Sequence, residues 1–220
     1  MTAYTNEQAR FNMVEQQVRP WEVLDAQVLQ LMGDMPRDAF VPGPYQDLAY
    51  ADIEIPLGHG RAMLSPKIEG RLLQALNIQP NDRVLEIGTG CGYLTACLAN
   101  LADKVISLDT KSDFITHADT CLKAQDITNT ELRCTDNLNE TIEGQAFDAI
   151  AVTGSLPEIP DTLRRQLTVG GRLFAVVGES PAMEAMLVTR TGEESWHSEA
   201  LFETELAQLT DVPTAEHFTF

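Results

Sequence analysis

A short apolar run followed by closely spaced glycines is the part of this sequence best suited to binding a ligand. The run covers residues 83–87, the turn after it reads Gly88-Thr89-Gly90-Cys91-Gly92, and a second apolar run closes on Asp109. Glycines let backbone approach a bound molecule closely. A carboxylate at the end of the next strand can accept hydrogen bonds from both hydroxyls of a ribose. This spacing favours a cofactor that contains adenosine.

The spacing of the glycines distinguishes two kinds of cofactor. A dinucleotide fingerprint has the form Gly-x-Gly-x-x-Gly. Here Tyr93 occupies the position of the third glycine, and Gly92 comes one residue earlier. The form Glu-x-Gly-x-Gly-x-Gly, starting at Glu86, resembles motif I of the methyltransferases that use S-adenosylmethionine (SAM). The resemblance implies a SAM site made by Glu86, Gly88, Thr89, Gly90, Gly92, Tyr93 and Asp109. A buried acid is costly without a partner, so a supporting role for Glu86 is as well founded as direct contact.

The composition is that of a globular protein and argues against several classes of partner. The chain has 220 residues, of which 44% are hydrophobic and 22% charged, which suits one α/β domain. Its formal net charge is −18. Nucleic acids and anionic membranes bind proteins chiefly through Lys and Arg, so we expect neither as a partner.

The cysteines and the apolar runs bear on metals and on compartment. The four cysteines show neither a C-x-x-C pair nor a histidine at zinc-ligand spacing, so we expect no metal. No run approaches the length of a membrane span. We therefore expect a cytoplasmic protein with reduced thiols.

Strands and helices are expected to alternate from residue 83 onward. The sequence predicts strands at residues 84–88, 105–109, 130–134, 147–152 and 172–177, and helices at 93–102, 112–125 and 161–167. Such alternation builds a doubly wound parallel sheet. Two later strands, 185–190 and 201–206, predict an antiparallel hairpin at the sheet edge, with its turn around Gly192. The fold class is α/β: a Rossmann-like methyltransferase sheet of seven strands, mostly parallel with one reversed edge strand, plus an N-terminal helical extension.

The N-terminal part is expected to form helices joined by a surface connector. Apolar residues at helical spacing predict helices over 6–18 and 25–32, the second capped by Asp25, and a further helix beginning at Pro66. The proline-rich stretch 35–50 predicts irregular structure that wraps the surface. We expect residues 1–79 to pack on a SAM-binding core of residues 80–220 as one structural domain, with the N-terminal part over the cofactor end.

Four further segments resemble the protein-L-isoaspartate O-methyltransferases. They read Met13-Val14-Glu15-Gln16-Gln17-Val18, Pro36-Arg37-Asp38-Ala39-Phe40-Val41-Pro42, Ala49-Tyr50-Ala51-Asp52 and Pro157-Glu158-Ile159-Pro160. The resemblance implies a SAM-dependent O-methyltransferase that acts on a carboxylate of a protein or peptide and releases S-adenosylhomocysteine (SAH). It also implies that Asp136 and Asn137 lie at the adenine ring, the alternative for Asp136 being an ordinary loop acid.

The acceptor loop departs from the pattern of that family. The family reads Gly-x-Gly-x-Thr-Ile-Ser-x-Pro, with both hydroxyls near the methyl acceptor, whereas this chain reads Gly58-His59-Gly60-Arg61-Ala62-Met63-Leu64-Ser65-Pro66. Ala62 and Leu64 replace the hydroxyl residues, and Ser65 falls one place late. The candidate catalytic residues are Ser65, Arg61 and His59. A guanidinium such as that of Arg61 can hold a carboxylate bidentately. The alternative for Arg61, equally well founded, is a solvated surface charge. For His59 the alternative is a turn residue.

These departures leave three functions open. The chain is an isoaspartyl methyltransferase, a same-fold enzyme for another acceptor, or a SAM- or SAH-binding sensor without transfer. A carboxylate is already nucleophilic at neutral pH, so alignment and exclusion of water are the main requirements. The apolar Leu64 predicts weak isoaspartyl activity. The expected partner is a protein, peptide or small carboxylate, and both a monomer and a homodimer are compatible with the sequence.

Overall fold

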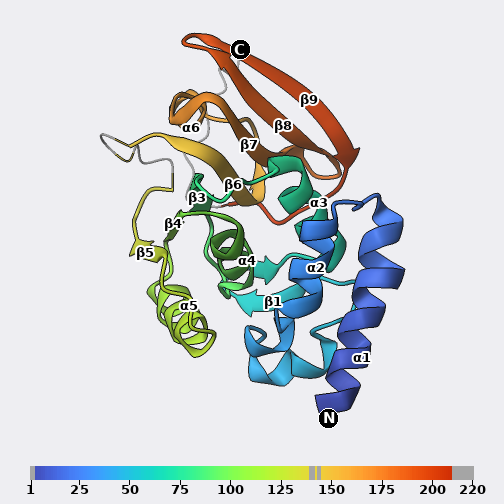
Figure 1. Ribbon diagram of the computed structural model, residues 1–220. Helices are drawn as coiled ribbons and strands as arrows, with labels where there is room; N and C mark the ends of the chain where they lie inside the picture. Colours follow the sequence, from blue (N-terminus) through green and yellow to red (C-terminus); the bar gives the residue numbers. More distant parts are fainter. Residues whose placement is uncertain (1–2, 139–141, 143–144, 210–220) are drawn as a thin grey trace.

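A mixed sheet of seven strands forms the centre of the molecule, with helices on both faces (Figure 1). We describe a computed structural model over residues 3–138, 142 and 145–209. The strand order is β5-β4-β3-β6-β7-β8-β9. The strands are β3 (Arg83–Ile87), β4 (Lys104–Asp109), β5 (Thr130–Cys134), β6 (Phe147–Leu156), β7 (Leu167–Glu179), β8 (Ala182–Gly192) and β9 (Ser195–Glu203).

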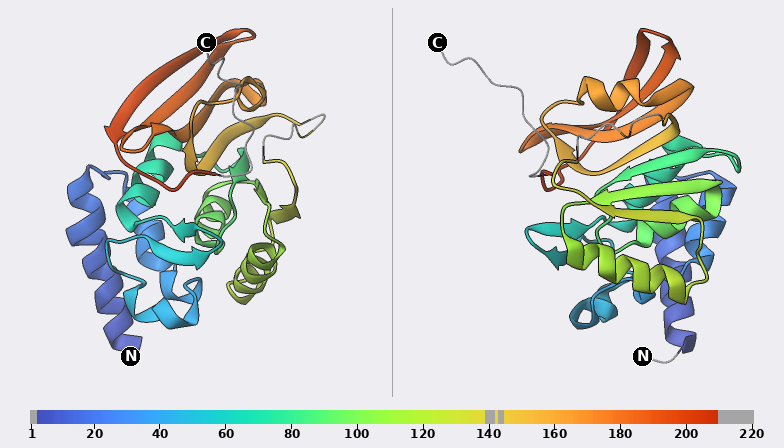
Figure 2. Two further views of the ribbon diagram at one scale, coloured as in Figure 1. Left: turned by 180° about the vertical axis from the view of Figure 1, so that it is seen from behind. Right: turned by 90° about the vertical axis from the view of Figure 1, so that its left-hand side faces the viewer.

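The direction of the strands confirms the predicted fold class. Strands β3 to β7 run parallel to one another, whereas β8 is antiparallel to both β7 and β9. The single reversed strand is thus β8, one place in from the edge strand β9. The β8–β9 hairpin lies at one end of the molecule and the start of α1 (Ala3–Met13) at the other (Figures 1 and 2).

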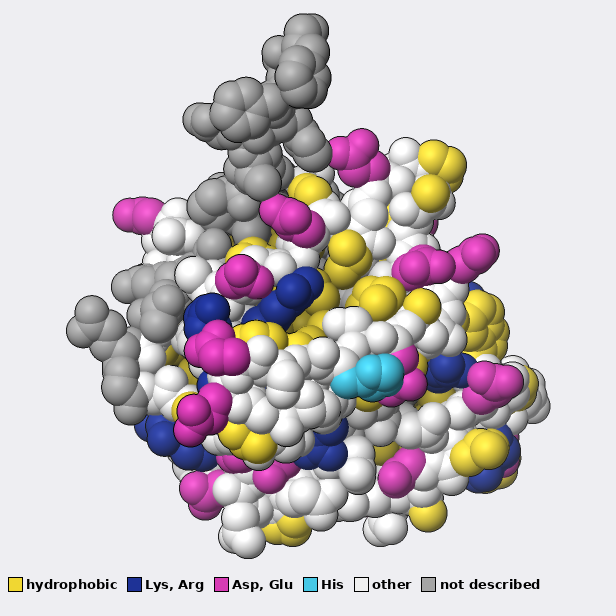
Figure 3. All heavy atoms as spheres, turned by 90° about the horizontal axis from the view of Figure 1, so that it is seen from above, with side chains coloured by type: hydrophobic (Ala, Val, Ile, Leu, Met, Phe, Trp, Pro, Cys, Tyr) yellow, Lys and Arg dark blue, Asp and Glu magenta, His cyan; other side chains and the backbone are white. Residues whose placement is uncertain are grey.

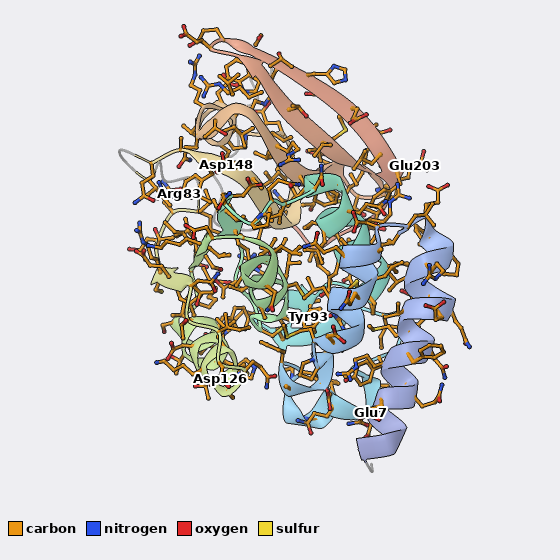
Figure 4. The ribbon with its side chains drawn as sticks, viewed as in Figure 1. Glu7, Arg83, Tyr93, Asp126, Asp148 and Glu203 are labelled. Atoms are coloured by element: carbon orange, nitrogen blue, oxygen red, sulfur yellow. The ribbon has the colours of Figure 1, made fainter. Side chains whose placement is uncertain are left out.

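Alternate residues of the central strands are buried against different layers. In β3, Val84 belongs to the core cluster shared with the N-terminal helices, whereas Leu85 and Ile87 belong to the cluster on the other face. Strands buried on both sides give nearly continuous apolar runs, which is why the sequence signalled them clearly. Near the amino ends of the strands, Asp148 of β6 links β3 and β7. Its carboxylate accepts hydrogen bonds from Arg83 N and Thr168 Oγ1, both at 2.9 Å (Figure 4).

The helices follow the predicted positions closely. They are α2 (Ala26–Asp34), α3 (Pro66–Leu76), α4 (Tyr93–Leu101), α5 (Ser112–Ala124) and α6 (Asp161–Arg165). Asp25 caps α2 as predicted, since its carboxylate accepts from Gln27 N at 2.8 Å and Val28 N at 3.1 Å. Helix α1 continues into a π-helical turn, η1 (Val14–Val18), and a 3-10 turn, η2 (Arg19–Trp21).

Two expectations are wrong, one about the proline-rich connector and one about the last strand. The stretch 35–50 contains two 3-10 helices, η3 (Arg37–Ala39) and η4 (Gly43–Leu48), and it does not merely wrap the surface. Arg37 in η3 is fully buried, and so are Phe40 and Ala49, which directly follow η3 and η4. The last strand begins at Ser195 and ends at Glu203, not at residues 201–206. In its first half every residue except the partly buried Trp196 is polar and exposed, as an edge strand allows, so it shows no apolar alternation.

A small hairpin precedes α3 and lies at the carboxyl ends of the central strands. Strands β1 (Ile55–Gly58) and β2 (Arg61–Met63) are antiparallel and joined at His59, where the sequence predicted only a turn. The predicted boundary between residues 79 and 80 falls in the loop between α3 and β3, and the division into two parts stays a prediction. None of the helices in the described ranges has the length and apolar character needed to cross a bilayer.

A candidate cofactor and acceptor site

The glycine turn after β3 is held in place by the strand beside it. The amide N–H groups of Gly88 and Thr89 donate to Leu108 O at 2.8 and 3.2 Å. Asp109 is 2% exposed, and its two carboxylate oxygens accept from Gly90 N at 3.0 Å and Lys111 N at 3.1 Å. Each carboxylate oxygen has a second lone pair, so Asp109 can still accept a ligand hydroxyl.

Two of the glycines are required by close packing. Gly88 has φ +99°, and a Cβ there would lie 2.2 Å from Thr153 Oγ1. Gly92 has φ +86°, and a Cβ there would lie 2.8 Å from Ala118 Cβ of α5. A side chain at either position would displace the turn, so this backbone path is open only to glycine.

A pocket at the carboxyl ends of β3 and β4 joins the glycine turn to the acceptor loop. Gly88, Gly90 and Asp109 line it, and so do Arg61, Ala62 and Leu64 of the acceptor loop. Its remaining walls come from the hairpin, α5, the end of β6 and the segment after β9: Glu54, Leu57, Phe114, Thr153, Gly154, Leu206, Ala207 and Leu209. The pocket therefore brings the predicted cofactor turn together with part of the predicted acceptor site.

An inner cavity beneath this pocket is lined by two carboxylates, Glu69 and Glu86. Glu86 is fully buried, and its Oε2 accepts from Thr95 Oγ1 at 2.5 Å and from Ser107 Oγ at 2.6 Å. The hydroxyls of Ser107 and Thr89 are 2.6 Å apart, which extends this network to the glycine turn. Burial raises the pKa of Glu86 to about 8, so it is mostly protonated at neutral pH.

The three candidate catalytic residues lie in different surroundings. Arg61 lines the pocket. Ser65 is 6% exposed and precedes α3 as its N-cap residue, with its carbonyl accepting from Ile68 N and Glu69 N. His59 is exposed at the hairpin turn, where its Nε2 lies 2.9 Å from Asp113 Oδ2. Neither Ser65 nor His59 is among the residues that line the pocket.

Three other predicted cofactor residues, Tyr93, Asp136 and Asn137, do not line the pocket. Tyr93 is fully buried in the interior (Figure 4), with its ring 5.7 Å from that of Phe40 in an edge-to-face contact. Asp136 and Asn137 are exposed in the loop after β5. That loop begins next to Asp109, because Thr135 N donates to Asp109 O at 2.9 Å.

Sequence reasoning assigned no role to several residues that build the site. Arg37 and Glu69 form a fully buried ion pair behind the acceptor loop. Thr153 Oγ1 donates to Ile87 O at 3.1 Å and Gly88 O at 2.7 Å, and so supports the turn from β6. Arg37 lies in segment 36–42, one of the segments in which the sequence resembles the family. For Thr153 nothing in the local pattern indicates a contact with residues about 65 positions earlier.

The segment after β9 closes the site from the side of β6. Ser155 N donates to Ala207 O and Leu209 N donates to Ser155 O, both at 3.0 Å. Leu209 packs against Gly88 and Gly154. Among the residues described, no group of three or more His, Cys, Asp or Glu side chains is placed to hold a metal ion.

Known proteins share both the sequence and the fold described above. Residues 8–213 match the family described as Protein-L-isoaspartate(D-aspartate) O-methyltransferase (PCMT). Protein-L-isoaspartate O-methyltransferase 1 of Rhodopseudomonas palustris (strain HaA2) is 36% identical over 201 residues, covering 91% of this chain and 82% of the relative. A protein-L-isoaspartate O-methyltransferase of Synechococcus sp. (strain JA-2-3B'a(2-13)) is 35% identical over 206 residues, covering 91% and 84%.

A solved structure extends the likeness to the fold. It is a candidate protein-L-isoaspartate O-methyltransferase from Plasmodium falciparum in complex with SAH, with a TM-score of 0.78 and 22% identity, covering 92% of this chain and 98% of that one. The sequence match spans the acceptor loop, the glycine turn and every strand of the sheet. On this ground the chain is a member of the protein-L-isoaspartate(D-aspartate) O-methyltransferase family.

Proposed function

We propose that this protein transfers the methyl group of SAM to the side-chain carboxylate of isoaspartyl residues in proteins or peptides. The observation that carries the proposal is the pocket in which Gly88, Gly90 and Asp109 face Arg61 and Leu64. The names of its relatives support the same reaction.

The residues of the turn fit a nucleoside cofactor. The backbone of Gly88 and Gly90 would lie against it, and Asp109 would accept its ribose hydroxyls. SAM supplies an electrophilic methyl group on a sulfonium. Glu86, protonated and hydrogen bonded within the sheet, supports the turn from below without placing a charge beside that group.

The acceptor side of the pocket orients a carboxylate and keeps it dry. The Arg61 guanidinium would hold the carboxylate with one oxygen directed toward the cofactor turn. Ala62 and Leu64 exclude water, which leaves that oxygen less solvated and more nucleophilic. No proton transfer is needed, because the attacking group is already ionised and the product ester is neutral.

An open groove beside the pocket suits a polypeptide substrate. The groove has a volume of about 850 Å³ and shares Glu54, Leu206 and Ala207 with the pocket. A small carboxylate would need only the pocket.

The four cysteines are all unpaired, which fits a reducing compartment such as the cytoplasm.

Ala62 and Leu64 favour a second candidate function. Both line the pocket where a hydroxyl would assist an isoaspartyl group. An apolar wall suits a carboxylate flanked by apolar groups, so the second candidate is methyl transfer to a different carboxylate through the same cofactor site.

One pair of measurements separates these possibilities. We expect calorimetry to show SAH binding that Asp109→Asn weakens, and labelled SAM to transfer its methyl to an isoaspartyl peptide but not to the matched aspartyl peptide. Transfer only to other carboxylates would support the second candidate, and tight binding without transfer would indicate a sensor. Folded protein that binds neither SAM nor SAH would refute the proposal.

A further inference from the structure

Arg37 is a fully buried cation that contacts four separate parts of the chain. Its Nε donates to Ala49 O at 2.8 Å, and its Nη2 donates to Leu64 O at 2.6 Å. Its Nη1 forms an ion pair with Glu69 of α3. The guanidinium carbon lies 4.9 Å from the centre of the Tyr93 ring.

Burying the charge of Arg37 costs free energy of folding, so stability alone does not explain this residue. A buried ion pair loses hydration on both partners, and well-packed apolar residues of similar volume are often as stable or more stable. Burial also raises the pKa of Glu69 to about 6, in spite of the neighbouring guanidinium of Arg37. An arginine differs from such replacements in its rigid planar fork, which fixes several acceptors relative to one another.

Arg37 contacts residues of the acceptor loop and the residue that follows the glycine turn. Leu64 lines the pocket together with Gly88 and Gly90, and its carbonyl accepts the hydrogen bond from Nη2. Glu69 lines the inner cavity together with Glu86 and Thr89. Tyr93 directly follows Gly92 and begins α4. One side chain thus touches the acceptor loop, the helix after that loop and the residue after the glycine turn.

We propose that Arg37 is a positioning residue that holds the acceptor loop at its working distance from the glycine turn, through the Leu64 carbonyl and the Glu69 carboxylate. This inference rests on the methyl-transfer function proposed above. An in-line displacement depends steeply on alignment, and a displacement of about 1 Å can cost on the order of a hundredfold in rate. Arg37 itself lines neither the pocket nor the inner cavity, so its effect passes through the residues it holds.

The test compares Arg37→Lys with a matched control, Arg172→Met. Lysine keeps the positive charge beside Glu69 but cannot reach Ala49 O and Leu64 O together. Arg172 is also a mostly buried arginine with an ion pair, to Asp82 at 3.4 Å, and it bonds Asn77 O at 3.0 Å, away from the acceptor loop. The measurements are thermal unfolding, SAH affinity, the single-turnover rate of transfer to an isoaspartyl peptide, and hydrogen exchange over residues 58–66.

We expect Arg37→Lys to lower the transfer rate by about ten- to a hundredfold with SAH affinity changed less than about threefold. Exchange over residues 58–66 should rise in this variant. Arg172→Met should lower the unfolding temperature without changing the rate or the exchange. If Arg37→Lys does not fold, the Arg37→Gln/Glu69→Gln double variant removes both charges and avoids an unpaired one, and the same losses are expected.

The outcomes separate this inference from the proposed function. A folded variant that keeps wild-type rate and exchange would overturn the positioning role. Equal losses of rate and SAH affinity would also overturn it, because they would indicate general damage to the cofactor site. Wild-type protein that binds SAH but methylates no carboxylate would refute the proposed function, whereas faster loop exchange in Arg37→Lys would still support the positioning role.

Discussion

Glu86 is one of two buried carboxyl groups, with Glu69, whose raised pKa links the stability of this protein to pH. It is fully buried, and burial raises its pKa from 4.5 to about 8. Between these two pH values the folded protein keeps a proton that the unfolded chain has released. Stability therefore falls as the pH rises from about 4.5 to about 8, and it levels off above that range.

Glu86→Gln is expected to remove the part of this dependence that Glu86 causes, because the amide can accept the same hydrogen bonds without ionising, and to leave the part below about pH 6 that Glu69 causes. The variant should gain stability over wild type by on the order of several kcal/mol at pH 8.5 and by little at pH 4.5. Urea unfolding at the two pH values measures the difference. Parallel pH profiles for the two proteins would show that Glu86 is not the group responsible.

Leu64 and Ala62 line the pocket in which we propose that the acceptor binds, and their replacement is expected to change the reaction. Ala62→Thr with Leu64→Ser restores two hydroxyls beside the acceptor. A donor to a group held in a dry site contributes about 1–3 kcal/mol, so isoaspartyl transfer should rise by about tenfold or more. Leu64→Ala, which widens the pocket without adding a donor, is the control. A double variant that folds but transfers no faster would mean that another donor already serves the acceptor.

The turn of the β1–β2 hairpin contacts the first turn of α5. His59 at its turn pairs with Asp113, and its ring meets the edge of Phe114 at 5.5 Å between centroids. The hydrogen bond from His59 lowers the pKa of Asp113. Since Leu57 and Phe114 both line the pocket, this contact helps to hold the hairpin over the glycine turn.

His59→Ala is expected to speed SAH dissociation without abolishing transfer. Exposed pairs contribute little, so the increase should be about two- to fivefold. Competition with excess unlabelled SAH gives the dissociation rate. Lys123→Ala is a suitable control, since Lys123 pairs with Asp119 on the same helix but takes no part in the pocket. Loss of transfer with unchanged dissociation would instead give His59 a direct catalytic role.

The charge of the whole molecule bears on the choice of substrate. The chain has a net charge of −18, and acidic side chains are spread over the face seen in Figure 3. The groove beside the pocket is lined by Glu54, Glu179 and Glu205. Burial and the neighbouring Glu205 raise the pKa of Glu54, as expected for acids gathered in one groove.

Isoaspartyl peptides with Lys or Arg next to the modified residue are expected to have a lower KM than peptides with Glu there. The difference should shrink between about 0.05 and 0.5 M salt, because screening weakens exposed charges. Glu179→Gln should reduce the preference while leaving kcat unchanged. A preference that is absent, or that resists salt, would show that the groove does not receive the flanking residues.

The sequence by itself determined the features that depend on neighbouring residues. The glycine turn, Asp109, the Asp25 cap and the start of α3 at Pro66 could all be predicted, because each follows from local backbone chemistry. The central strands could be predicted because both of their faces are buried. The edge strand β9 could not, because Trp196 is the one apolar residue in its first half, so no apolar period marks the strand.

Only the tertiary structure decided which of these residues meet. Arg37 and Glu69 are 32 positions apart, and His59 and Asp113 are 54 apart, so no local pattern marks either pair. Whether Ser65 reaches the pocket was also decided by the tertiary structure: Ser65 is the N-cap residue of α3, and Leu64 lines the pocket while Ser65 does not. Packing of the connector against α3 and α4 decides these contacts, because the orientation of a loop side chain depends on what the rest of the chain leaves room for.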